Sequence, residues 1–190
     1  NTNPAVKPAD ESKLGFGKIF TDHMFTMDWD IDKGWHDPKI VPFENLSIHP
    51  GSTVLHYGLE IFEGLKAYRT ADGEIRMFRP LENAIRMRNS AIRMSMPQID
   101  PEFMVKAMET FVSVENDWVP KGFGTSLYIR PYMFGDDADL GLHGLKHARF
   151  LIIASPSGSY YAGGLDPVSI IIEDEDVRAV KGGTGTAKCG

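Results

Sequence analysis

The chain has 190 residues, of which 42% are hydrophobic and 11% aromatic, and its formal net charge is −6. This composition is typical of a globular protein with one domain, or with one domain and part of another. The acidic balance argues against nucleic-acid and anionic-membrane partners, because both need a net basic surface. No apolar run reaches the length of a membrane span. The only cysteine, Cys189, cannot form an internal disulfide, so we expect a reducing compartment such as the cytoplasm.

The N-terminal quarter reads as strands and turns after a polar start. Prolines and charged residues before residue 15 indicate a mobile arm, aromatic and β-branched runs indicate strands, and Ser52 is a candidate helix cap. In chain order we expect an arm over 1–14, a strand over 19–30, turns over 32–38, a strand over 40–47 and a short helix over 52–64.

The middle of the chain carries stronger local signals. Asp72-Gly73 stands between two alternating segments, which is typical of a β-hairpin turn. Pro80 suits the first turn of a helix, and Asp100 followed by Pro101 is a typical helix start with a capping side chain. We therefore expect a hairpin of residues 65–69 and 74–78, a helix from 80 to Pro97 and a helix over 100–118.

Two hydrophobic strands are expected next, over 126–130 and 149–154. Strands, then helices, then strands predict an α+β fold, with helices packed on one side of an antiparallel sheet. The expected organisation is a small α+β domain over 15–156, a linker over 157–167, and a further unit over 168–190 that begins with a strand at 168–172.

A glycine-rich loop over 181–190 contains Lys188. It is not a Walker loop, because Lys188 follows alanine and precedes cysteine, and it lacks the third glycine of a dinucleotide fingerprint. A lysine amine among small residues suits a Schiff base instead, because bulky neighbours would block its approach to a carbonyl carbon. The alternative is an ordinary exposed loop lysine.

Two groups of cationic residues also have surface alternatives. Tyr128 and Arg130 lie two apart on an expected strand and so share a face, which suits a substrate carboxylate or an ordinary surface ladder. A second group indicates a solvated basic face rather than a nucleic-acid site, although Arg86 alone suits a phosphate through its bidentate fork. The members of this group are Arg76, Arg79, Arg86, Arg88 and Arg93.

Metal binding is not expected. His143 and His147 have a spacing that could hold zinc on a helix, but Gly144 lies between them and no third ligand is near. The acidic run over 173–176 lacks the alternating spacing and glycine of a calcium loop, so we interpret it as a solvated turn.

Several motifs stand in order along the chain. They are Phe20-Thr21-Asp22-His23-Met24, Leu46-Ser47-Ile48-His49-Pro50, Leu55-His56-Tyr57, Phe62-Glu63-Gly64-Leu65-Lys66-Ala67-Tyr68, Ser126-Leu127-Tyr128-Ile129-Arg130-Pro131 and the Lys188 loop. Read together, they resemble the branched-chain amino acid aminotransferases, pyridoxal phosphate enzymes of fold type IV. The resemblance runs from about residue 15 to residue 190.

The resemblance implies roles for particular residues. Lys188 would hold pyridoxal 5'-phosphate as a Schiff base and move the α-proton, Arg86 would bind the cofactor phosphate, and Arg178 would lie near the cofactor. Arg130 would receive the distal carboxylate of glutamate. The wall around a branched side chain would comprise Phe16, Phe62, Tyr128 and Tyr160. In a homodimer, the partner's pocket would be reached by Tyr57, Leu140 and Leu142.

The implied reaction is transfer of the amino group from Leu, Ile or Val to 2-oxoglutarate, giving branched 2-oxo acids and glutamate. Members of the family continue well beyond the lysine into a part that carries further cofactor ligands, so we expect the 190 residues alone to be inactive. The alternatives are another enzyme of the fold, such as a D-amino acid aminotransferase or an aminodeoxychorismate lyase, and a non-catalytic dimerising or binding module.

Overall fold

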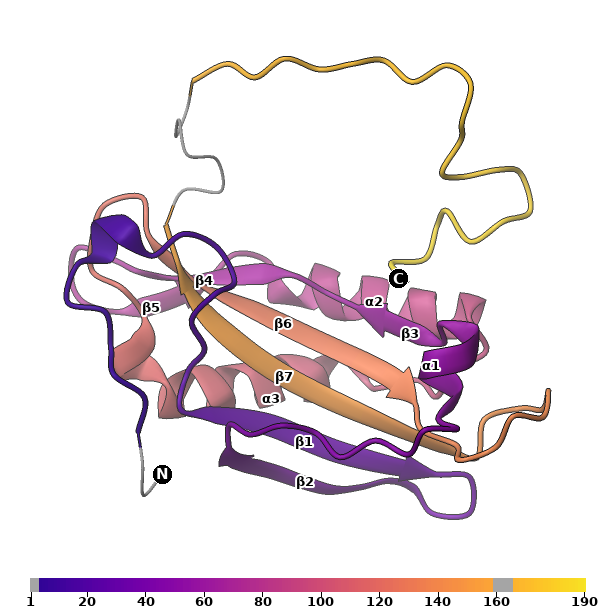
Figure 1. Ribbon diagram of the computed structural model, residues 1–190. Coiled ribbons are helices and arrows are strands. Elements are labelled where there is room, and N and C mark those ends of the chain that lie inside the picture. The colour runs from indigo at the N-terminus through magenta and orange to yellow at the C-terminus, as the bar shows by residue number, and fades with distance from the viewer. Residues whose placement is uncertain (1–3, 159–165) are drawn as a thin grey trace.

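The computed structural model describes residues 4–158 and 166–190 (Figure 1). Its helices are α1 Thr53–Tyr57, α2 Pro80–Arg93 and α3 Pro101–Val114, with short 3-10 turns at Glu11–Lys13 and Asn116–Trp118. Its strands are β1 His23–Asp30, β2 Gly34–Pro42, β3 Glu60–Phe62, β4 Leu65–Arg69, β5 Ile75–Met77, β6 Ser126–Gly135 and β7 His147–Ser157.

In the described residues the strands form one seven-stranded antiparallel sheet in the order β2-β1-β7-β6-β4-β5, with β3 also paired to β6. Neighbouring side chains of a strand point to opposite faces, so Phe150 joins the main core with α2 and α3, whereas Leu151 joins a smaller cluster beneath Leu46 and Ile48. Figure 1 shows α2 and α3 on the same side of the sheet. The predicted α+β fold is confirmed.

Local signals place both long helices correctly. The Asp100 carboxylate accepts a hydrogen bond from the Phe103 N–H at 2.9 Å, and Pro101 occupies the first helical position. The apolar stripe that follows, including Met108 and Phe111, is fully buried against the sheet. The hairpin of β4 and β5 pairs as predicted, with Tyr68 opposite Arg76.

Three predicted elements differ from the structure, and one of them, the strand expected over 40–47, is only the end of β2, which stops at Pro42. The turn expected at 36–38 lies within β2, where Asp37 has a φ of +54° and the pairing with β1 shifts register. Because β2 is an edge strand, it tolerates Pro38. The expected helix over 52–64 ends at Gly58, whose φ of +58° is typical of a helix C-terminus, and β3 follows it.

The later strands also differ in extent. β6 and β7 are longer than predicted and pair over ten residues, from Ser126 opposite Ser157 to Gly135 opposite Ala148. Consequently Ser157, the first residue of the expected linker, is a buried part of β7. The predicted strand over 168–172 is not formed among the described residues, and its isoleucines are exposed.

The N-terminal residues contact the domain. The Ala5 N–H donates to Asp22 Oδ1 at 2.6 Å, and Glu11 Oε2 accepts from the N–H groups of Lys121 and Gly122 at 2.9 and 2.6 Å. The mobility expected of this arm stays a prediction. Across the described residues, no helix has both the length and the apolar character that a membrane crossing requires.

Candidate active site

The lysine loop folds back onto the domain, so that the C-terminus lies beside α2 and β3 (Figure 1). The Lys188 N–H donates to the buried Ser90 Oγ at 2.9 Å, and the Lys188 carbonyl accepts from the Phe62 N–H at 3.0 Å. Farther along the loop, Arg93 Nη2 donates to the carbonyls of Gly182 and Gly183 at 2.8 and 3.0 Å. These contacts fix the backbone of the lysine against α2 and β3.

The loop needs small residues for steric reasons. A Cβ added at Gly185 would lie 2.4 Å from the Ala179 Cβ, a distance that only a backbone shift would relieve. The chain can therefore turn closely enough to bring Lys188 to the domain. The side chain of Lys188 is half-buried, and no carboxylate among the described residues pairs with its ammonium.

A cavity of about 300 Å³ opens at the lysine. Among the described residues that line it, Arg86, Arg178 and Lys188 are cationic and none is acidic. Residues 185–187 of the loop and the Phe62 ring also line it. The lining therefore suits a ligand that carries negative charge and a group that reacts with an amine.

Phe62 links this cavity to a second group of functional side chains. The Lys188 ammonium lies 4.5 Å from the centre of the Phe62 ring, and the Arg130 guanidinium carbon lies 4.6 Å from the same point. Both distances are within the range of cation–π attraction. One aromatic ring therefore contacts the candidate nucleophile and the candidate carboxylate-binding residue.

The second cavity, about 340 Å³, is lined by Phe16, Tyr128 and Arg130. The predicted shared face of Tyr128 and Arg130 is confirmed, because Arg130 Nη2 donates to the Tyr128 hydroxyl at 2.8 Å. Phe16 packs edge-on against Tyr128, with ring centres 4.8 Å apart. Arg130 Nε is buried and has no hydrogen-bond partner in the described residues. A buried unpaired donor is costly.

Arg86 has a partner that the sequence did not reveal. Its Nε and Nη2 donate to Oε1 and Oε2 of Glu63 at 2.7 and 2.8 Å. Glu63 is fully buried, and its hydrogen bond raises the pKa of the Arg86 guanidinium above the usual value. The only local sign of this pair in the sequence is a glutamate next to Gly64 at a strand end. The pairing itself is a tertiary contact with α2, which local sequence does not show.

The remaining expected site residues do not all lie together. Tyr57 and Leu140 lie together at the surface, since the Tyr57 hydroxyl donates to the Leu140 carbonyl, and Leu142 in the same loop is 87% exposed. Arg178 lines the lysine cavity through an exposed segment. Tyr160 lies outside the described residues.

Other candidate groups have ordinary structural roles. Arg76 pairs with Glu74 and Arg79 with Glu82 at the surface, which agrees with a solvated basic face. The interpretation of the acidic run as a turn is confirmed, because Glu173 accepts from the N–H groups of residues 175 and 176. Within the described residues, no group of three or more metal-ligating side chains is arranged to hold a metal ion.

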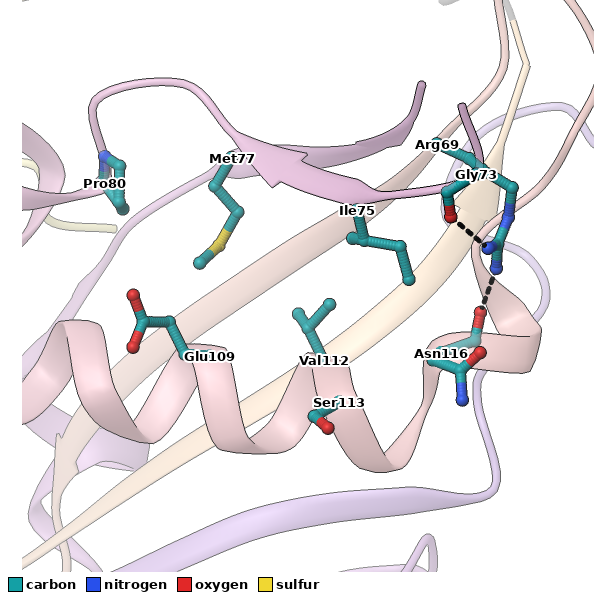
Figure 2. A pocket seen from close by; sticks show the side chains of 9 residues that line it. All are labelled: Arg69, Gly73, Ile75, Met77, Pro80, Glu109, Val112, Ser113 and Asn116. Atoms are coloured by element: carbon teal, nitrogen blue, oxygen red, sulfur yellow. Dashed lines mark hydrogen bonds between the residues drawn. The ribbon is translucent and has the colours of Figure 1, made fainter. Parts of the chain in front are cut away.

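A cavity of about 560 Å³ lies far from the lysine, between the β4–β5 hairpin and α3 (Figure 2). Ile75 and Val112 point toward one another across it, as Figure 2 shows. Its cation, Arg69, donates to the carbonyls of Gly73 and Asn116 at 3.1 and 2.7 Å. These bonds tie the hairpin to the residues after α3, so Arg69 has a structural role. The size of this cavity alone therefore does not make it the candidate reaction site.

Comparison with known sequences identifies the family that the motifs resemble. The chain is 51% identical over 180 residues to branched-chain-amino-acid transaminase 1 of Bacillus subtilis, covering 94% of this chain and 51% of the relative. It is 46% identical over 194 residues to the branched-chain-amino-acid aminotransferase of Mycolicibacterium smegmatis, covering 100% and 53%. No family model matches the chain. It spans about half the length of the curated relatives it matches.

Solved structures agree with these relatives. The Escherichia coli branched-chain amino acid aminotransferase aligns with a TM-score of 0.58 at 25% identity, over 73% of this chain and 41% of that one. The branched-chain aminotransferase of the archaeon Thermoproteus uzoniensis aligns with a TM-score of 0.57 at 27% identity, over 74% and 43%. The recognition made from the motifs is confirmed: the chain is a homologue of the branched-chain-amino-acid aminotransferases, with their fold type IV architecture.

Proposed function

We propose that the protein transfers the amino group of leucine, isoleucine or valine to 2-oxoglutarate, with pyridoxal 5'-phosphate bound at Lys188. The observation that carries this proposal is the contact of one Phe62 ring with both Lys188 and Arg130. It links a nucleophilic amine to a carboxylate-binding side chain across an apolar surface. Such an arrangement suits a pocket that must accept both a branched side chain and glutamate.

The lysine cavity fits the cofactor. Arg86 and Arg178 supply cations for a phosphate, and the Lys188 amine, unpaired in the described residues, is available to bond a carbonyl carbon. When bound, pyridoxal phosphate supplies an electron sink for the negative charge that develops at the α-carbon of the amino acid. Lys188 Nζ would hold the cofactor and move the α-proton as a general base and acid.

The second cavity fits the side chain of the substrate. Phe16 and Tyr128 offer apolar ring surface to a branched chain in this cavity, and Phe62 offers its ring from the neighbouring lysine cavity. The Arg130 guanidinium, which lines the same cavity, offers donors to the distal carboxylate of glutamate. A similar branched-chain amino acid aminotransferase has been solved with N-(5'-phosphopyridoxyl)-L-glutamate and with 4-methylvaleric acid, a carboxylate with a branched chain. Both ligands support the proposed pair of substrates.

The proposal includes a homodimer. Tyr57, Leu140 and Leu142 form a mainly apolar group at the surface, 46%, 62% and 87% exposed respectively. An exposed apolar group of this kind suits a contact with a second copy of the chain. Sedimentation of the full-length gene product, with Leu142→Asp as the test variant, would give a dimer for the native protein and a shift toward monomer for the variant.

Borohydride reduction of the full-length gene product with pyridoxal phosphate, followed by peptide mapping, tests the central assignment. We expect the label on Lys188 and transamination of leucine with 2-oxoglutarate, and we expect Lys188→Ala to remove both. Lys181 lies in the same loop and is exposed, so Lys181→Ala is the matched control. Label on Lys181 and none on Lys188 would contradict the proposal. The 190-residue chain assayed in parallel should show no turnover.

A further inference from the structure

We propose that Glu63 is a positioning residue, which holds the Arg86 guanidinium in the orientation that binds the phosphate of the cofactor. The inference rests on the proposed function, because it concerns the same cavity. Glu63 directly follows β3 and Arg86 lies in the second turn of α2, so their pairing also joins these two elements.

The hydrogen-bond pattern shows what Glu63 does to the guanidinium. A guanidinium has five N–H donors in one plane. Glu63 uses the Nε edge, taking one donor from Nε and one from Nη2. Both N–H groups of Nη1 and the second N–H of Nη2 remain unused. One N–H from each nitrogen can donate to two oxygens of a phosphate in bidentate fashion. The carboxylate therefore fixes the plane and leaves the correct edge for a ligand.

Glu63 is itself held in place. It is fully buried, whereas the Arg86 side chain is 52% exposed. Asn83 Nδ2 donates to Glu63 Oε2 at 2.9 Å, and the Gly64 N–H donates to the same oxygen at 3.3 Å. The exposed partner would be free to change rotamer without this anchor. The arrangement is a rigid anion that orients a flexible cation at the mouth of a cavity.

A simple charge argument makes the opposite prediction. Glu63 is an anion near the expected phosphate, so its neutralisation should strengthen phosphate binding if only net charge matters. If orientation matters more, neutralisation should weaken binding, because Arg86 loses its fixed plane. The sign of the change therefore separates a positioning role from a merely electrostatic one.

The experiment measures the dissociation constants of pyridoxal phosphate and of pyridoxal, which lacks the phosphate, for the full-length gene product. We define the ratio as the dissociation constant of pyridoxal phosphate divided by that of pyridoxal. For Glu63→Gln we expect this ratio to rise by about 10- to 100-fold, as for loss of a charge-assisted hydrogen bond. Pyridoxal affinity should stay at the native value. Glu74→Gln is the matched control, because Glu74 forms a comparable pair with Arg76 at the exposed hairpin.

An unchanged or lower ratio for Glu63→Gln would overturn the inference. An equal loss of affinity for both ligands leaves the ratio unchanged and so has the same meaning. If Glu63→Gln does not fold, Asn83→Ala replaces it, because it removes one of the donors that hold Glu63. The ratio for Asn83→Ala should also rise, by a smaller factor, and an unchanged ratio would overturn the inference. Failure of the proposed function would be seen in a different experiment, as borohydride label on a lysine other than Lys188. The ratio of dissociation constants could still be measured in that case.

Discussion

The Arg130 guanidinium lies over the ring of Phe62, with its central carbon 4.6 Å from the ring centre, and also bonds the Tyr128 hydroxyl at 2.8 Å. β3 and β6 are paired, with Phe62 opposite Tyr132, so the ring and the guanidinium come from adjacent strands. The aromatic contact holds the flexible arginine side chain toward the second cavity. Its strength is measurable, because each partner can be replaced separately.

A double-mutant cycle with Phe62→Leu and Arg130→Met should give a coupling free energy of about 0.5–2 kcal/mol in urea unfolding, the range of a cation–π contact. The reason is that each replacement keeps an apolar side chain and removes only one side of the attraction. Phe62→Leu combined with Arg149→Met is the control, since Arg149 lies over Phe134 instead. A coupling no larger than that of the control would show that the contact contributes nothing to stability.

Arg130→Ala should weaken the use of glutamate more than the use of leucine. Only glutamate brings a second carboxylate to the guanidinium, and a hydrogen bond to a charged group is worth about 1.5–3 kcal/mol. The expected change in the ratio of kcat/KM values, leucine over glutamate, is therefore about 10- to 100-fold. Steady-state assays with both amino donors measure it, and equal losses for the two would argue against this role of Arg130.

Gly64→Ala should disturb Tyr128. A Cβ at Gly64 would lie 2.2 Å from the Tyr128 hydroxyl oxygen, so the ring must move and its bond from Arg130 is broken. Overpacking of this kind costs about 1–3 kcal/mol in the free energy of unfolding. The cost should shrink in a Tyr128→Phe background, which removes the nearest atom. Gly144→Ala is the control, because a Cβ there meets nothing within 4 Å.

The Glu115 carboxyl predicts a pH dependence of stability. Burial raises its pKa above the usual value, although the nearby His23 partly opposes this. The raised pKa means that the folded state binds the proton more tightly than the unfolded state. Its contribution to the free energy of unfolding is therefore complete below about pH 4.3 and is lost as pH rises through the folded pKa.

Glu115→Gln should remove this component, so that the stability of the variant relative to the native chain rises from about pH 4.3 upward. The groups that face Glu115 from β1 and the segment before it are His23 and Asp22. Glu109→Gln, on the exposed face of α3, the helix that Glu115 follows, is the control. Chemical denaturation across the pH range measures the difference, and parallel curves for native protein and Glu115→Gln would refute the assignment.

Elements specified by neighbouring residues could be predicted, and those specified by distant partners could not. The Asp72-Gly73 turn and the cap at Asp100 act within a few residues, so the hairpin and α3 were correct. The spacing of Leu55, Leu59 and Phe62 suited a helix, yet Ile61 pairs with Met133 in β6 and the segment becomes a strand. That pairing joins residues far apart in the sequence, and no local pattern contains it.

The candidate site follows the same rule. Motif resemblance assigned Lys188, Arg86 and Arg130, and the structure brings Lys188 and Arg130 to one ring. Glu63 lay inside a recognised motif without an assigned part, because its significance depends on α2, about twenty residues later. Sequence shows which side chains have suitable chemistry, whereas a buried ion pair is visible only after folding.

Arg86 and Ser90 are four residues apart on α2, and Ser90 receives the backbone N–H of Lys188. Residues at this spacing lie one above the other on a helix, about 6 Å apart. The separation between the proposed phosphate ligand and the anchor of Lys188 is therefore a fixed molecular dimension, set by the pitch of the α-helix. A single residue inserted between them would rotate one side chain about 100° around the axis relative to the other. An insertion or deletion within this turn of α2 would therefore separate the two groups that the helix now holds together.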